Sequence, residues 1–204
     1  MRMTERVGLW GVLAAFVLTS SASTEAMAQK ISEKSVRTLM QYALSYTPDR
    51  FTGADGTTVH INRKDPEAIK KLMVPLKKAE EAVLAGRLAA HARVCGLFDE
   101  EKNTFISFVL REKQSKQWTP QQIIYLRSLF YTTEMLMVGK VQVIQRDDGG
   151  KKVVIREGEP AIKSCTDQQR NKVKDLVAAY LKEGPDLAEA AGSAPAATGS
   201  VKKN

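Results

Sequence analysis

The sequence predicts a mainly α-helical fold, namely a small helical bundle of about five helices with one β-hairpin and a single disulfide. Three observations support this prediction. From Ser32 onward, apolar residues recur at the spacing of amphipathic helices in most segments. A capping residue stands before a proline at Asp65-Pro66 and at Thr119-Pro120, which is typical of a helix start. The chain also contains only two cysteines, Cys95 and Cys165.

The first 28 residues are typical of a secretory signal peptide. Arg2 and Arg6 precede an apolar run from Val7 to Leu18, and Ala26 and Ala28 are the small residues expected at a cleavage site. The run is shorter than the roughly 20 residues that a membrane-spanning helix needs. We therefore expect a periplasmic or secreted protein whose mature chain starts at Gln29 and contains no transmembrane segment.

The mature chain is expected to begin with a helix from Ser32 to about Tyr46, because Pro48 disfavours helical geometry at the residue before it. Residues 51–64 are predicted to be a loop with a short extended piece at 57–61. The second helix is expected to start at Asp65-Pro66.

This second helix should kink or restart at Pro75 and end at Cys95. Gly96 would be its left-handed cap, with Leu97 as the apolar residue that folds back onto the helix. Asp99 is then expected to cap a third helix, whose buried side would include Phe105, Phe108 and Val109.

A fourth helix should follow Thr119-Pro120, and we interpret Trp118 just before it as a packing residue. Its apolar stripe consists of Ile123, Leu126, Phe130 and Met137. Thr166 should cap the last helix, which Gly184-Pro185 would end. The apolar stripe of that helix consists of Val173, Leu176, Val177, Tyr180 and Leu181.

The character of the chain changes between these last two helices. β-branched runs at 141–145 and 153–156 lie on either side of Asp147-Asp148-Gly149-Gly150, a pattern typical of a β-hairpin. We therefore predict one helical domain over 29–183, with residues 141–156 inserted as a hairpin. Residues 184–204 are rich in Ala, Gly, Ser and Pro and are expected to form a disordered tail.

Cys95 and Cys165 are the residues most informative about chemistry. In an oxidising compartment two thiols most simply form one disulfide. That bond would clamp the last helix beside the second and close a 70-residue loop, worth about 4 kcal/mol in the chain-entropy model. Free thiols, an intermolecular bond and a metal site formed by His91, Cys95 and Cys165 remain alternatives, because His91 lies one turn from Cys95 on the same helix face.

The motifs of the common enzyme classes do not occur in the sequence. It contains no C-x-x-C, no phosphate-binding glycine loop, no G-x-S-x-G and no H-E-x-x-H. We therefore expect no cofactor, and we assign no catalytic or metal-binding residues. One enzymatic alternative remains: Glu134 interrupts an apolar helix, and a carboxylate buried there would have a raised pKa and need a partner. His91 could be that partner in a hydrolase-like site.

Basic pairs recur every seven residues in one part of the chain. They are Arg63-Lys64, Lys70-Lys71 and Lys77-Lys78. Seven residues are nearly two helical turns, so the last two pairs would share a helix face that could dock on an anionic surface. The alternative is a solvated face partly neutralised by Glu67, Glu80 and Glu81. A net charge of +8 also favours anionic neighbours, and nucleic acid is not expected in an exported protein's compartment.

Three short runs carry a resemblance to known proteins: "HARVCGLF" at 91–98, "WTPQQIIYL" at 118–126 and "SCT" at 164–166. Together they resemble uncharacterised small exported helical proteins of Gram-negative bacteria, over residues 85–180. The resemblance implies no activity, and it favours the Cys95–Cys165 bridge. The function we expect is that of a periplasmic accessory protein that binds an envelope component or another protein, rather than that of an enzyme. The partner, the biological process and the oligomeric state are left open by the sequence.

Overall fold

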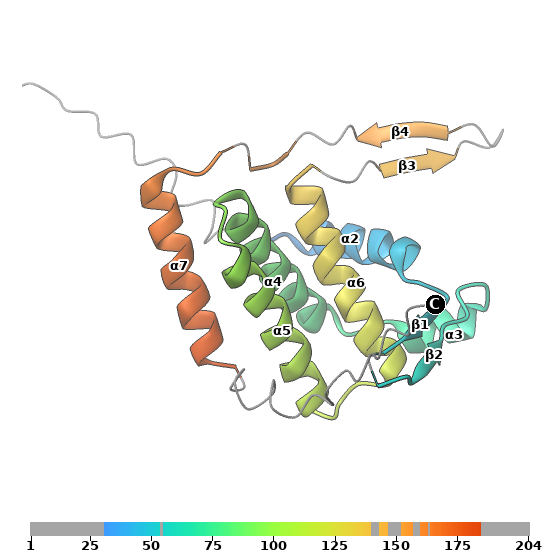
Figure 1. Ribbon diagram of the computed structural model, residues 1–204. Helices are drawn as coiled ribbons and strands as arrows, with labels where there is room; N and C mark the ends of the chain where they lie inside the picture. Colours follow the sequence, from blue (N-terminus) through green and yellow to red (C-terminus); the bar gives the residue numbers. More distant parts are fainter. Residues whose placement is uncertain are drawn as a thin grey trace, which may run out of the picture. The chain divides into compact units, whose positions relative to one another are not determined.

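The computed structural model confirms the mainly helical class (Figure 1). It describes residues 31–53, 55–139, 143–146, 152–156, 160–162 and 164–184. The predicted signal peptide at 1–28 and the predicted tail after Gly184 lie outside these residues. The described elements are α2 (Glu33–Tyr46), β1 (Arg50–Thr52), β2 (Thr58–His60), α3 (Pro66–Leu72), α4 (Leu76–Val94), α5 (Phe98–Gln114), α6 (Pro120–Met137), β3 (Val143–Arg146), β4 (Lys152–Arg156) and α7 (Asp167–Lys182).

Most helices begin where the sequence places a capping residue. The side chains of Ser32 and Asp65 accept hydrogen bonds from backbone N–H groups in the first turns of α2 and α3. Thr119 and Thr166 each form a complete capping box at the start of α6 and α7. Such bonds satisfy N–H groups that have no partner inside the helix, so the predicted starts of these four helices are confirmed.

The predicted second helix is two helices in the structure. α3 ends at Leu72 and α4 begins at Leu76, with Met73 and Pro75 in extended conformation between them. Proline has no N–H and clashes with the preceding turn, so a helix cannot continue undisturbed through Pro75. Of the two predicted outcomes, a kink or a restart, the structure shows the restart. The structure also pairs β1 with β2 in an antiparallel hairpin, where only a short extended piece was expected at 57–61.

The predicted cap of the third helix is wrong. α5 begins at Phe98, its N-cap is Leu97, and Asp99 lies inside the first turn. The reason is the tight connection from α4: Gly96 has a φ of +69°, and the N–H of Leu97 donates to the carbonyl oxygen of Ala92 at 2.9 Å. This left-handed cap confirms the predicted end of α4, and it turns the buried Leu97 directly into the next helix.

α4 and α6 lie at the centre of the described helices, because each packs against several of the others. The buried positions of α4 are mainly alanines, whereas α6 supplies large side chains. Among these is Tyr125, whose hydroxyl donates to the carbonyl oxygen of Met40 in α2 at 3.0 Å. Small residues opposite large ones let the two helix backbones approach closely.

This close approach predicts an unusual result for a glycine-to-alanine change in a helix. A Cβ added at Gly86 in α4 would lie 2.6 Å from the carbonyl oxygen of Phe130 in α6. Helix propensity favours alanine by about 1 kcal/mol, but overpacking costs about 1–3 kcal/mol, and a backbone oxygen cannot rotate away. Because the contact is with backbone, the cost should lie in the upper part of this range, and we expect Gly86→Ala to lower the free energy of unfolding by about 1–2 kcal/mol in urea denaturation.

Gly184→Ala is the matched control for this change. Its Cβ would approach the ends of the Ser107 and Arg111 side chains most closely, and the nearest backbone atom, the carbonyl oxygen of Leu181, would lie 3.3 Å away rather than 2.6 Å. We expect Gly184→Ala to lower the free energy of unfolding by less than Gly86→Ala does. If Gly86→Ala were as stable as the wild type, the two helix backbones would not be in the tight contact described.

The predicted hairpin between α6 and α7 is confirmed in its described part. β3 and β4 pair antiparallel, with an irregularity in the pairing between Val143 and Ile144. Residues 141–142 and the predicted turn at 147–150 lie outside the described residues. The base of the insertion is held at the end of α6, because the N–H of Ala161 donates to the carbonyl oxygen of Met137 at 2.9 Å. None of the helices in the described ranges combines the length and the apolar character that crossing a membrane requires.

Candidate functional site

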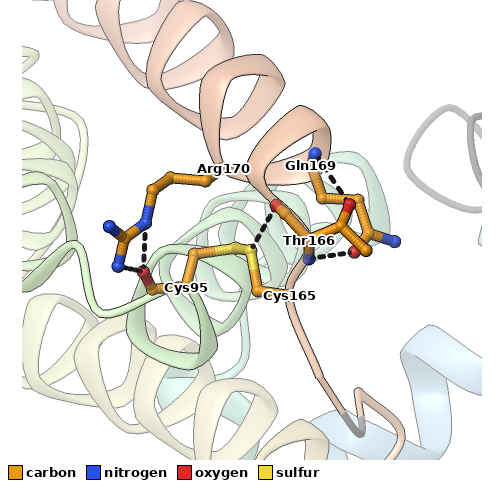
Figure 2. Close-up of a disulfide and its surroundings, with 5 residues drawn as sticks. All are labelled: Cys95, Cys165, Thr166, Gln169 and Arg170. Atoms are coloured by element: carbon orange, nitrogen blue, oxygen red, sulfur yellow. Dashed lines mark hydrogen bonds between the residues drawn. A yellow bond between two sulfur atoms is a disulfide. The ribbon is translucent and has the colours of Figure 1, made fainter.

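The predicted disulfide is present and joins two helix ends (Figure 2). Cys95 caps the C-terminus of α4, and Cys165 stands directly before Thr166, the N-cap of α7; the two Cα atoms are 5.0 Å apart. Arg170 of α7 reinforces this joint, because its Nε and Nη2 donate to the carbonyl oxygen of Cys95 at 2.9 and 2.6 Å. Sequence reasoning missed Arg170, since nothing in the pattern of α7 separates it from its exposed neighbours.

The disulfide leaves neither sulfur available as a thiolate ligand. In the described residues, no three His, Cys, Asp or Glu side chains are grouped so that they could hold a metal ion. His91 lies one turn before Cys95 and is half-buried. Burial, with a smaller effect from the charge of Arg87, lowers the pKa of His91 to about 4. The metal-carrier alternative therefore has no support in the geometry.

The lowered pKa of His91 predicts a pH-dependent effect on stability. The unfolded histidine takes up a proton below about pH 6.5, whereas the folded one resists protonation until about pH 4, so acid favours the unfolded state. We expect His91→Gln to leave stability unchanged near pH 8 and to raise it relative to the wild type by about 1–2 kcal/mol near pH 5. Urea denaturation at both pH values checks this, and an equal effect at both would refute it.

Glu134 is buried, as expected for an acid that interrupts an apolar helix, with only 1 % of its side chain exposed. Burial and the neighbouring Glu101 raise its pKa to about 7, against the opposing effect of Arg93. Arg93 is the charged partner: its Nε lies 2.6 Å from Oε1 of Glu134, and its Nη2 pairs with Glu101. The hypothesis that His91 partners Glu134 is therefore wrong.

These three side chains form a partly buried charge cluster, Arg93–Glu101–Glu134, at the junction of α4, α5 and α6, in which Glu134 is the enclosed member. Sequence reasoning missed Arg93 and Glu101, because their role depends on how three helices meet. A general acid or base must come within hydrogen-bonding distance of its substrate, and a carboxylate that is almost fully enclosed cannot do so. Glu134 is therefore placed to pair with Arg93 rather than to contact a substrate.

The basic pairs do not share one helix face, because the break between α3 and α4 separates them. Two of the six predicted residues are engaged in ion pairs. Arg63 pairs with Asp49 at 2.7 Å, and Lys78 pairs with Glu81 and, at 3.1 Å, with the buried Glu112. The other four, Lys64, Lys70, Lys71 and Lys77, are exposed.

Glu112 was not singled out from the sequence, yet it joins three parts of the fold. It accepts a hydrogen bond from Lys78 of α4 and another, at 2.7 Å, from Nε1 of Trp118. Trp118 also packs against the apolar core, in agreement with its interpretation as a packing residue. This network accounts for a buried carboxylate without any catalytic role.

A groove of about 350 Å³ opens beside α6. Most of its lining is apolar or aromatic, with Tyr46 and Phe51 on one side and Ile124 and Met135 on α6. Its charged lining residue is Arg127, whose guanidinium carbon lies 4.6 Å from the ring centre of Phe51 and 5.5 Å from that of Phe105.

Sequence reasoning missed this aromatic groove. Its lining comes from the end of α2, from β1 and from α6, which are adjacent only after folding. The available hint was a pair of residues with polar ends, Arg127 and Tyr131, spaced four apart and therefore on one face of the helix. Burial lowers the pKa of Arg127 and raises that of Tyr131, because it disfavours the charged form of each.

The geometry thus defines a helical domain closed by a disulfide, in which Glu134, the described carboxylate with a raised pKa, is enclosed and an aromatic groove is open. No protein-family model matches the chain, and no curated protein or solved structure shows significant similarity to it. The resemblance to small exported helical proteins accordingly stays a prediction.

Proposed function

We propose that this protein is an exported accessory protein that acts by binding an envelope component or another protein. The observation that carries the proposal is the contrast between Glu134, which is enclosed, and the aromatic groove beside α6, which is open. Apolar grooves with a few placed polar groups are typical of binding sites. A protein that performs acid–base chemistry would instead expose its perturbed acid to the substrate.

Export is supported by two independent features of the chain. The composition of residues 1–28 is that of a secretory leader, and Cys95 and Cys165 form a disulfide, a bond that persists mainly in oxidising compartments. The four exposed lysines, Lys64, Lys70, Lys71 and Lys77, favour an anionic partner.

Cell fractionation combined with mass spectrometry tests the export half of this proposal. We expect the periplasmic or secreted fraction to hold a chain that starts at Gln29 and carries no free thiol. A full-length chain with its leader, found in the cytoplasm with both thiols reduced, would contradict it.

Cross-linking capture tests the binding half. The processed protein should enrich a specific envelope component. If that component is anionic, a variant with four substitutions should enrich less of it, namely Lys64→Gln, Lys70→Gln, Lys71→Gln and Lys77→Gln. Arg37→Gln is the control, because Arg37 is an exposed cation that already pairs with Glu33. Failure to enrich any envelope component above the level bound by unfolded protein would refute the proposal.

A further inference from the structure

Arg127 differs from Arg93 and Lys78, two other partly buried cations of the fold. Arg93 and Lys78 each contact two carboxylates. Arg127, in contrast, has no carboxylate or hydrogen-bond partner within the described ranges, and its guanidinium stacks on the rings of Phe51 and Phe105. Burial of this cation is reflected in a lowered pKa. A cation that is partly desolvated without a charged partner costs free energy, and an anion bound beside it would offset that cost.

The surroundings of Arg127 define the kind of anion that would fit. The guanidinium lies over two aromatic rings, and a planar guanidinium matches a carboxylate through two parallel hydrogen bonds. Among the described residues that line the groove, Arg127 is the only cation, so the site suits a single negative charge better than a doubly charged phosphate. The hydroxyl of Ser128 is already a donor to the carbonyl oxygen of Ile124, at 3.1 Å.

The rest of the groove is suited to an apolar body. Tyr46, Phe51, Ile124 and Met135 supply apolar and aromatic surface, and the volume of about 350 Å³ lies at the small end of the range for ligand sites. Burial of apolar ligand surface against these side chains would supply the affinity, and the charge would supply the orientation.

We propose that the groove beside α6 binds a small amphipathic carboxylate, such as a medium-chain fatty acid or an arylalkanoic acid, with Arg127 pairing with the carboxylate. The inference rests on the proposed binding function and names the ligand class for one of its sites. Phe51 and Phe105 act as positioning residues that hold the guanidinium in place.

Calorimetric titration of the processed protein with octanoate, below the concentration at which octanoate forms micelles, tests this. Octan-1-ol and octylammonium are the matched probes, with the same chain but no charge or the opposite one. We expect octanoate to bind at least about ten-fold more tightly than either, because a desolvated charge-assisted pair contributes at least this factor. Equal binding of the three probes, or no binding of octanoate at millimolar concentration, would overturn the proposal.

Variants then assign the effect to Arg127. Arg127→Gln should weaken octanoate binding by about ten-fold or more and leave octan-1-ol unchanged, whereas Arg37→Gln should change neither. In NMR spectra, octanoate should shift the Nε–Hε signal of Arg127. Unchanged octanoate affinity in Arg127→Gln, or a shift confined to other arginines, would overturn the proposal.

A second variant keeps the test decisive if Arg127→Gln does not fold. Ser128→Phe places a ring in the groove and retains Arg127, so it should abolish binding of octanoate while the protein melts cooperatively. Persistent binding in a folded Ser128→Phe variant would overturn the proposal. The titration uses purified protein and does not depend on location, so its failure is separate from a failure of the fractionation or capture experiments.

Discussion

Replacing both cysteines, Cys95→Ala together with Cys165→Ala, is expected to lower the free energy of unfolding by about 4 kcal/mol. The bond spans 70 residues of sequence, and removing it lets the unfolded chain explore many more conformations. Urea denaturation followed by Trp118 fluorescence and circular dichroism measures the change.

The native fold should survive this double substitution, because α7 keeps other contacts with the domain. Val173 and Val177 are buried, Arg111 donates to the carbonyl oxygen of Tyr180 at 3.1 Å, and Arg170 still reaches the carbonyl oxygen of residue 95. Reduced wild-type protein is the control and should match the double variant. If the oxidised wild type, with its bond verified by mass, were no more stable than the variant, the disulfide would have no stabilising role.

Replacing Arg93 with methionine is expected to lower the free energy of unfolding by about 3 kcal/mol near pH 8. Methionine keeps much of the apolar stem but removes the cation that Glu101 and Glu134 share. Two carboxylates would then face each other in a partly buried site, which raises the pKa of Glu134 further.

The loss in Arg93→Met should shrink as the pH falls. A carboxylate whose pKa is higher in the folded than in the unfolded state binds its proton more tightly when the protein is folded. Its charged form therefore destabilises the fold at pH values above the folded pKa, and this loss of stability decreases as the pH falls below that pKa. In the wild type the pKa of Glu134 is already raised to about 7, so the relief should be evident between about pH 8 and pH 5.5. Urea denaturation at the two pH values measures it.

Adding Glu134→Gln to Arg93→Met is the companion variant. The amide removes one of the two like charges, and we expect it to recover at least half of the lost stability near pH 8. An equal loss at both pH values, with no recovery in the double variant, would show that Arg93 acts through packing alone.

The local features of the fold could be predicted because their causes are local. Thr119 and Thr166 satisfy N–H groups within three residues of themselves, and Gly96 adopts a left-handed conformation that other residues rarely adopt. The wrong assignment of Asp99 as a cap has a different cause. Its residue type suits a cap, but the buried Leu97 and the tight turn at Gly96 set the start of α5 instead.

The sites could be predicted only in part. The burial of Glu134 could be predicted, because an acid within an apolar stripe is buried whichever helix that stripe packs against. Its partner was assigned wrongly, because His91 and Arg93 are two residues apart on α4 and the sequence does not show which of them faces α6. The basic pairs share a spacing of seven, but that spacing has no meaning across the break at Pro75.

The sequence by itself determined the helical class, most helix ends and the pairing of the only two cysteines. The class and the helix ends depend on the conformational preferences of a few neighbouring residues, and the pairing follows because the chain contains only two cysteines. The tertiary structure alone decided that Arg93 lies between two carboxylates, that Arg170 holds the carbonyl group of Cys95, and that Arg127 lies over the ring of Phe51 in an aromatic groove. These contacts join residues of different helices and strands, and only the packing of α4 against α6 and its neighbours sets the distances between them.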